Sequence, residues 1–76
     1  MLTFVYLFMD KSVIAGKIKE ARLQAGLTQT QLGEKIGTKK EGVSRIESGK
    51  HEIELSTLDK IAEALNCNLR IELEPK

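Results

Sequence analysis

The sequence contains little of what catalytic and metal centres need. It has one cysteine and one histidine, with no CxxC pair, no metal-ligand cluster and no nucleotide-binding loop. A single cysteine cannot form a disulfide within the chain, which suits a reducing cytoplasm. Because 76 residues build only one small core, there is also little depth for a catalytic cleft. We therefore expect no enzymatic activity, no cofactor and no metal site.

Long hydrophobic runs are absent as well. The apolar segment MLTFVYLFM, residues 1–9, is too short to span a bilayer. It also lacks the basic region and the small-residue cleavage site of a signal peptide. Two interpretations remain open: an N-terminal β-strand, which we favour, or residues encoded upstream of a natural start at Met9. No membrane partner is expected, and we expect a cytoplasmic protein.

The net charge of +1 conceals an uneven distribution. Residues 10–50 carry nine Lys or Arg against five Asp or Glu, whereas residues 51–76 carry three against six. A basic first part suits a polyanion as its partner, and an acidic tail suits a different role. Random scatter of charge over a small surface is the alternative.

Four helices are predicted from their end signals, two of them in the first half of the chain. The first helix begins at Asp10 or Ser12 and stops at Gly26. The second begins at Thr28, which forms a capping box with Gln31 three residues later. Both segments therefore have a marked beginning, and each carries apolar residues at helical spacing.

Similar signals mark the third and fourth helices. Thr38 with Glu41 reads as a second capping box, and the helix that it opens ends at Gly49. Ser56, with Asp59 three residues later, opens the fourth helix. The residues of the four helices that we expect to face the core are Ile14, Ile18, Ala21, Ala25, Leu32, Ile36, Val43, Ile46, Leu58, Ile61, Ala62 and Leu65.

After the fourth helix the apolar period changes from helical to alternating. The segment LRIELE, residues 69–74, is typical of a half-buried strand that ends at Pro75. A lone strand leaves backbone groups unsatisfied, so it needs a partner, either the N-terminal apolar segment or a second molecule. We divide the chain into an extension at 1–9, a helical domain at 10–68 and a dimerisation strand at 69–76. The side chains expected to face a core from this strand are Leu69, Ile71 and Leu73.

The second and third helices are separated by a very short turn at Gly37. A turn of this length makes the two helices cross steeply, as in a helix-turn-helix. Gly33 has no side chain and so permits the third helix to approach closely. The third helix turns Val43 and Ile46 inward, and its outward face carries Lys39, Lys40, Glu41, Gly42, Ser44 and Arg45.

Two charged residues fall on inward faces. Arg22 follows Ile18 by four residues, and Glu47 follows Val43 by four. Because a charge in a core is tolerated only when it is paired and hydrogen-bonded, we predict that Arg22 and Glu47 form a structural ion pair. Cys67 is expected to be a small packing residue, and His51 a surface residue.

From Ile14 to Leu69 the chain resembles the phage-repressor-like helix-turn-helix proteins of the Cro/C1 type, the XRE family. The segments that carry the resemblance are IKEARLQAGLTQTQLGEKIG, VSRIESGK and LSTLDKIAEALN. The resemblance implies a mainly α fold: a small lambda-repressor-like bundle of about four helices, with the C-terminal strand added. It also implies that the third helix enters the major groove of double-stranded DNA, and relatives have the Arg22–Glu47 pair.

The resemblance also implies roles for individual residues. Base readers would be Lys40, Glu41 and Arg45, and Gln29 would contact a phosphate. Ser44 is a further candidate base reader, and the further candidates for phosphate contacts are Thr28, Lys39 and Lys50. Geometry agrees, because these base readers lie about one helical turn apart on one face. The role of Glu41 stays open, because it could equally serve as the acid of the capping box. Gly42 departs from the family, which usually has a larger or polar residue there.

Two hypotheses about function follow. The first is a sequence-specific transcriptional repressor that binds a palindromic site as a homodimer. The second is an antitoxin-like module that neutralises a toxin protein through its acidic, strand-ended tail, with DNA binding secondary. The sequence does not specify the operator.

Overall fold

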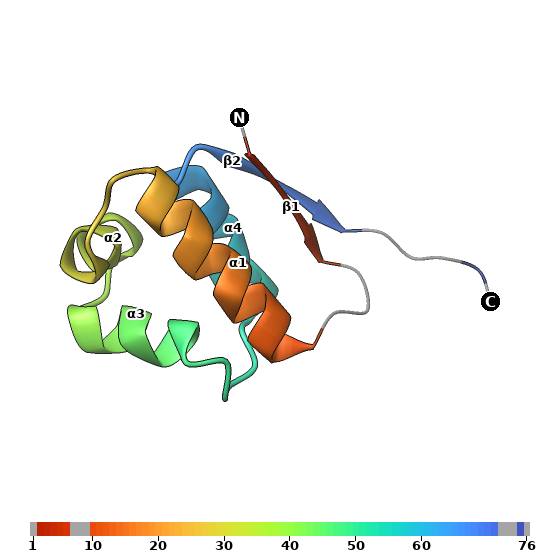
Figure 1. Cartoon of the computed structure of the whole chain (residues 1–76), viewed down its shortest axis with the longest axis horizontal. Helices are drawn as coiled ribbons and strands as arrows, with labels where there is room; N and C mark the ends of the chain where they lie inside the picture. Colours follow the sequence, from red (N-terminus) through yellow and green to blue (C-terminus); the bar gives the residue numbers. More distant parts are fainter. Residues whose placement is uncertain (1, 7–9, 72–74, 76) are drawn as a thin grey trace.

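The mainly helical fold predicted from the sequence, with four helices and a C-terminal strand, is confirmed. The structure, a computed structural model, describes residues 2–6, 10–71 and 75. Helices α2 and α3 lie at one end of the molecule, and the two strands lie on the opposite side of α1 (Figure 1). Among the described residues, no helix combines the length and the apolar character needed to cross a membrane. The elements in chain order are β1 (Leu2–Tyr6), α1 (Lys11–Gln24), α2 (Gln29–Ile36), α3 (Lys40–Glu47), α4 (Leu55–Ala64) and β2 (Cys67–Ile71).

The hydrophobic core takes one deeply buried side chain from every helix. Ile18, Leu32, Val43 and Ile61 come from α1, α2, α3 and α4 in turn, and all four are almost completely inaccessible to solvent. Helices of 8 to 14 residues are marginal by themselves, so their stability depends on this shared core. The prediction for Ala25 is wrong, because the helix ends there and the residue is exposed.

The capping box at the start of α2 is confirmed. The backbone N–H of Gln31 donates to Thr28 Oγ1 over 3.0 Å, and the backbone N–H of Thr28 donates to Gln31 Oε1 over 2.8 Å. The other end of α2 closes at Gly37, whose φ of +83° lies in the left-handed region that favours glycine. Both ends of this short helix are therefore fixed by local sequence.

The second predicted capping box, formed by Thr38 and Glu41, is wrong. Lys39 is the N-cap of α3, and no side chain caps this helix. Thr38 instead completes the end of α2, because its backbone N–H donates to the carbonyl of Gly33 over 2.8 Å. Its side chain lies against Gly42, where an added Cβ would collide with it. Helix α3 begins one residue later than a cap at Thr38 would require, so this residue lies outside the N-cap position.

The expected start of α4 also needs correction, whereas α1 begins at Asp10, one of its two predicted starts. Helix α4 begins two residues earlier than Ser56 suggests, because the carbonyl of Glu54 accepts from the N–H groups of Thr57 and Leu58. Asp10 is the N-cap of α1 but makes no side-chain bond to the backbone; its carboxylate accepts from the Ser12 hydroxyl over 3.2 Å.

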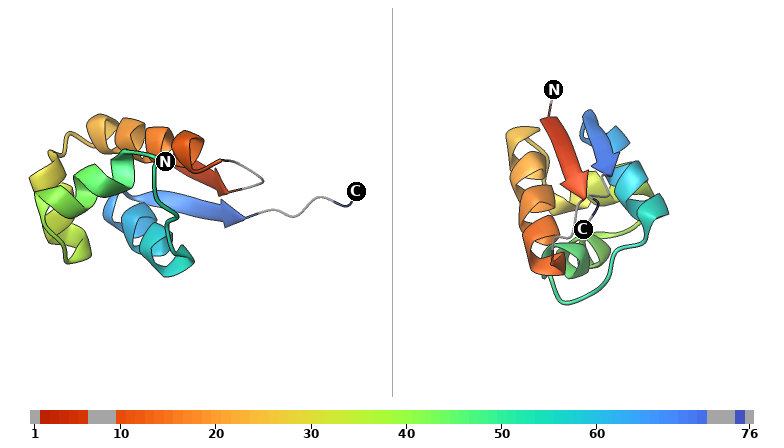
Figure 2. Two further views of the ribbon diagram at one scale, coloured as in Figure 1. Left: turned by 90° about the horizontal axis from the view of Figure 1, so that it is seen from below. Right: turned by 90° about the vertical axis from the view of Figure 1, so that its right-hand side faces the viewer.

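The strands pair with each other in parallel and within one chain. The register runs from Leu2 opposite Cys67 to Tyr6 opposite Ile71, so the N-terminal apolar segment, one of the two partners that the sequence left open, pairs with the C-terminal strand. Figure 2 shows β1 beside α1 and β2 beside α4. The C-terminal strand begins at Cys67 rather than Leu69, and both of these side chains pack on the core. The prediction for Leu73 lies outside the described residues.

Gly33 and Gly16 form a matched pair for testing how closely the helix-turn-helix is packed. A Cβ on Gly33 would lie 2.9 Å from the Thr38 carbonyl oxygen and 3.0 Å from the Lys39 carbonyl carbon. A Cβ on Gly16, in the interior of α1, would meet no atom within 4 Å.

We expect Gly16→Ala to raise the free energy of unfolding by up to about 1 kcal/mol, through better helix propensity. Gly33→Ala should lower it by about 1–3 kcal/mol, because backbone atoms must move to make room. Chemical denaturation followed by circular dichroism measures both changes. If both substitutions stabilise the protein, the turn between α2 and α3 is not packed closely against Gly33.

Candidate nucleic-acid interface

Helices α2 and α3 form a helix-turn-helix. Only residues 37–39 connect them, and the backbone of this connection packs directly on Gly33. Figure 1 shows α2 nearly end-on while α3 lies across the view, so the two helices cross steeply. The close approach expected at Gly33 is present, but the turn makes the contact rather than α3 itself.

One side of α3 is buried and the other faces solvent. Val43 is fully buried, and Ile46 packs against the core from the same side. Within the described part of the chain, none of the side chains on the opposite side makes a hydrogen bond or ion pair with a protein group. These exposed residues are Lys39, Lys40, Glu41, Ser44 and Arg45. The face is thus cationic with one acid, and its side chains are available to an external partner.

The sequence left open whether Glu41 is the acid of a capping box or is free to contact a base. Because no side chain caps α3, the Glu41 carboxylate is not held in a capping box. It is exposed in the first turn of α3, where a carboxylate interacts favourably with the helix dipole. The carboxylate is therefore available for contacts beyond the protein.

The start of α2 presents a second group of donors beside this face. The capping box uses the N–H groups of Thr28 and Gln31, which leaves the backbone N–H groups of Gln29 and Thr30 without a partner among the described residues. Such N–H groups, together with the positive end of the helix dipole, favour an anion. Thr28 is exposed and Gln29 is half-buried.

Arg22 and Glu47, the two inward charges of the sequence, form a bidentate ion pair. Arg22 Nε donates to Glu47 Oε2 over 2.7 Å, and Arg22 Nη2 donates to Glu47 Oε1 over 3.1 Å. A third guanidinium nitrogen, Nη1, donates to the carbonyl of Leu27 over 2.8 Å. The two side chains are only 7% and 3% exposed. This pair joins α1, the α1–α2 connection and the end of α3.

A further bond in this cluster was not predicted from the sequence. Gln29 Nε2 donates to Glu47 Oε1 over 3.2 Å, so one carboxylate oxygen accepts from both Arg22 and Gln29. Eighteen positions separate Gln29 from Glu47, and no periodicity relates residues on different helices. Only the packed arrangement of α2 against α3 brings them together.

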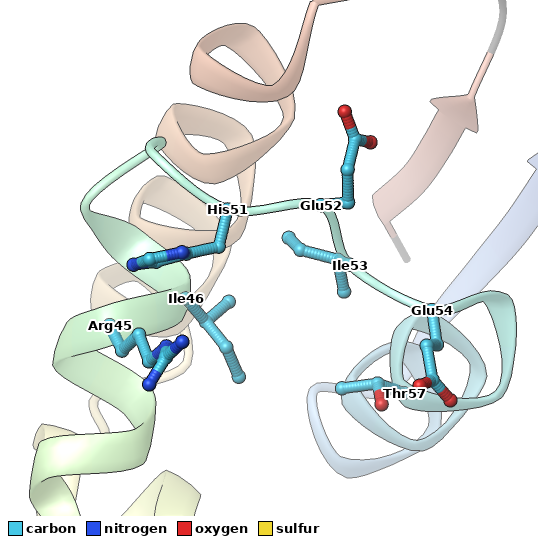
Figure 3. Close-up of a pocket in the computed structure, with 7 residues that line it drawn as sticks. All are labelled: Arg45, Ile46, His51, Glu52, Ile53, Glu54 and Thr57. Atoms are coloured by element: carbon cyan, nitrogen blue, oxygen red, sulfur yellow. The ribbon is translucent and has the colours of Figure 1, made fainter.

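A surface hollow of about 290 Å³ is bordered by residues of α3, of the loop that follows it and of α4. Figure 3 shows Arg45 and His51 on the α3 side of the hollow, Glu54 and Thr57 on the α4 side, and Ile46 and Ile53 between them. His51 is exposed, as the sequence predicted. Lys50 is also exposed, just after the end of α3, with its backbone N–H donating to Ser48 Oγ over 3.3 Å. The loop therefore adds one exposed lysine after the end of α3.

Comparison with known proteins gives matches over most of the chain. Residues 18–71 match the family described as Helix-turn-helix. An uncharacterized HTH-type transcriptional regulator of Archaeoglobus fulgidus is 34% identical over 53 residues, which are 70% of this chain and 76% of that protein.

Two solved structures are similar in fold and in sequence. The restriction-modification controller protein C.AhdI of Aeromonas hydrophila is 27% identical, with a TM-score of 0.73 over 78% of this chain and 86% of that one. A chain in the structure of the HipA–HipB–O2–O3 complex is 30% identical, with a TM-score of 0.69 over 91% of this chain and 94% of that one.

Proposed function

The chain belongs to the XRE-type helix-turn-helix family of DNA-binding transcription regulators, and on that premise we propose that it is a sequence-specific repressor that places α3 in the major groove. The observation that carries the proposal is the solvent side of α3, where three cationic side chains and one acid have no partner in the described part of the chain. A major groove admits one α-helix, and the first turns of that helix reach the base edges.

The side chains of α3 suit different bases. Lys40 and Arg45 donate to guanine O6 and N7, and Glu41 accepts from the amino group of cytosine. Ser44, which lies on the same exposed face, can donate or accept. Burial of Glu41 against guanine O6 or thymine O4 would be repulsive, so this residue would discriminate against those bases as well as favour cytosine.

Phosphate contacts would hold the helix in register. Gln29 and Thr28 lie at the start of α2, where free N–H groups favour an anion. Lys39 and Lys50 are exposed at the two ends of α3 and add positive charge there. These contacts are not sequence-specific, and they make binding sensitive to salt.

A homodimer on a palindromic site would double the number of base pairs read. We place the dimer contact at the small sheet, because β1 has β2 on one side and no second strand among the described residues. Of the three residues expected to form the dimer strand, Leu69 packs on its own core, and Ile71 pairs through its backbone with Tyr6. We therefore favour a dimer contact through the backbone edges of the strands over one through the side chain of Leu69. Leu73 is the third residue of the proposed dimer strand.

The proposal is tested by fluorescence anisotropy with the promoter DNA upstream of the gene that encodes this chain, and with a scrambled duplex of equal length. We expect tight binding to the promoter, weak binding to the scrambled duplex, and a loss of affinity for both as salt rises. Equal and weak binding to both duplexes would overturn sequence-specific recognition and would leave α3 as a generally basic surface.

A second function, binding of a partner protein, is favoured by one observation. The similarity to the chain of the HipA–HipB–O2–O3 complex extends over 91% of this chain, which is more than the helix-turn-helix family match covers. An antitoxin-like role would use the surface of α4 and β2, where a hollow of about 370 Å³ is bordered by Asp59 and Glu63. Under this alternative, removal of positive charge from α3 would leave the function intact.

A further inference from the structure

The buried ion pair does more than hold the fold together: we propose that Glu47 is a positioning residue that fixes the side chain of Gln29 for its contact with a DNA phosphate. The inference rests on the proposed function, because it takes the phosphate contact of Gln29 as given. It adds a specific role for a residue that is itself inaccessible to DNA, since the Glu47 side chain is only 3% exposed.

The hydrogen-bond geometry supports this role. Glu47 Oε1 accepts from Gln29 Nε2 over 3.2 Å, and Arg22 holds the same carboxylate from the other side through two bonds of 2.7 and 3.1 Å. The carboxylate therefore cannot rotate freely, and it presents a fixed, charged acceptor to Gln29. A hydrogen bond to a charged acceptor is stronger than one between neutral groups.

The consequence for Gln29 is a restricted amide that keeps a donor free. A glutamine amide has two N–H donors, and Glu47 uses one of them. The second N–H has no partner among the described residues, and neither do the backbone N–H groups of Gln29 and Thr30 at the start of α2. A free glutamine side chain would lose rotamer entropy when it binds phosphate, and the bond to Glu47 removes part of that cost beforehand.

The charge balance of the cluster is consistent with this arrangement. A carboxylate near a phosphate would normally repel it, but Arg22 neutralises Glu47 at hydrogen-bond distance. Arg22 is in turn tied to the Leu27 carbonyl, two residues before Gln29. The network thus fixes both the backbone that leads into α2 and the side chain that begins it.

A double-mutant cycle of Gln29→Ala and Glu47→Gln, measured as affinity for the promoter duplex, tests the inference. We expect each single substitution to weaken binding about two- to tenfold, the range of one hydrogen bond. In the Gln29→Ala background, Glu47→Gln should cause no further loss. If Glu47 acts only on the fold, it will cause the same loss in both backgrounds, and the inference is then wrong.

Two controls separate positioning from stability. All affinities are measured at a temperature at which circular dichroism shows every variant folded, and Ile61→Val weakens the core on α4 without removing any hydrogen bond of the network. Ile61→Val should bind DNA as the unaltered protein does. If Glu47→Gln does not fold, Glu47→Asp replaces it, because it keeps the charge but withdraws the carboxylate from Gln29 and from Arg22.

A measurement on the unaltered protein completes the test. The side-chain amide of Gln29 should show a higher NMR order parameter than that of Gln24, which is exposed at the end of α1. Equal mobility of the two amides would overturn the inference without any variant. If the unaltered protein binds no duplex, both the proposed function and the inference are wrong. If it binds the promoter specifically, but Glu47→Gln lowers the affinity equally with and without Gln29→Ala, only the inference is wrong.

Discussion

Replacement of Arg22 by methionine is expected to lower the free energy of unfolding by about 3–5 kcal/mol, the usual cost of removing one partner of a buried ion pair. The substitution would leave the Glu47 carboxylate buried with only Gln29 as a donor. It would also remove the donor of the Leu27 carbonyl. Because a small domain has a total stability of about 5 kcal/mol or little more, most of the fold would be lost at 37 °C.

Urea denaturation followed by circular dichroism measures this loss, and the chain offers two controls. Lys11 and Glu52 also form an ion pair, but over 4.0 Å and with side chains 45% and 83% exposed, so Lys11→Met should change stability very little. Replacement of Arg22 and Glu47 together by apolar residues should recover much of the loss. A loss for Arg22→Met as small as that for Lys11→Met would contradict the structural role of the buried pair.

The double substitution Lys40→Ala and Arg45→Ala is expected to weaken binding to the promoter duplex by at least about 30-fold. Each base contact from such a side chain is worth about 1–3 kcal/mol, so two of them contribute at least about 2 kcal/mol. Affinity for the scrambled duplex should fall much less. The discrimination between the two duplexes would therefore collapse, while the stability should stay unchanged because both side chains are exposed.

The matched control removes the same charge from other helices. Lys17 on α1 and Lys60 on α4 are both exposed, so Lys17→Ala with Lys60→Ala should lower the affinity for both duplexes slightly and equally. If both pairs of substitutions cause the same loss on the promoter, recognition comes from net charge and not from α3. Full retention of function by the α3 variant would favour the partner-binding alternative.

Sequence rules for helix capping correctly predicted the helix ends that depend only on neighbouring residues. The capping box of Thr28 and Gln31 involves two residues on the same turn, so the sequence alone specifies it. The pairing of Arg22 with Glu47 was predictable for another reason, because a buried charge needs an opposite charge and the inward faces carry one of each sign.

Rules of this kind failed where a capping signal does not coincide with the start of the helix. Thr38 has the spacing of a cap for α3, but Lys39 is the N-cap, and the backbone N–H of Thr38 bonds to the last turn of α2. Ser56 looks like a helix start, yet the chain enters the helical conformation two residues earlier. The bond from Gln29 to Glu47 gave no sequence signal, since it depends on how two helices are placed in three dimensions.

The parallel pairing of β1 with β2 also determines when the fold can be completed during translation. Sixty-five positions separate Leu2 from its partner Cys67, so an interval passes between the synthesis of β1 and that of its partner strand. At about 5–20 residues per second, this interval lasts about 3–13 seconds. The helices lie between the two strands and can pack first, so closure of the sheet is expected to be the last step in the maturation of the nascent chain.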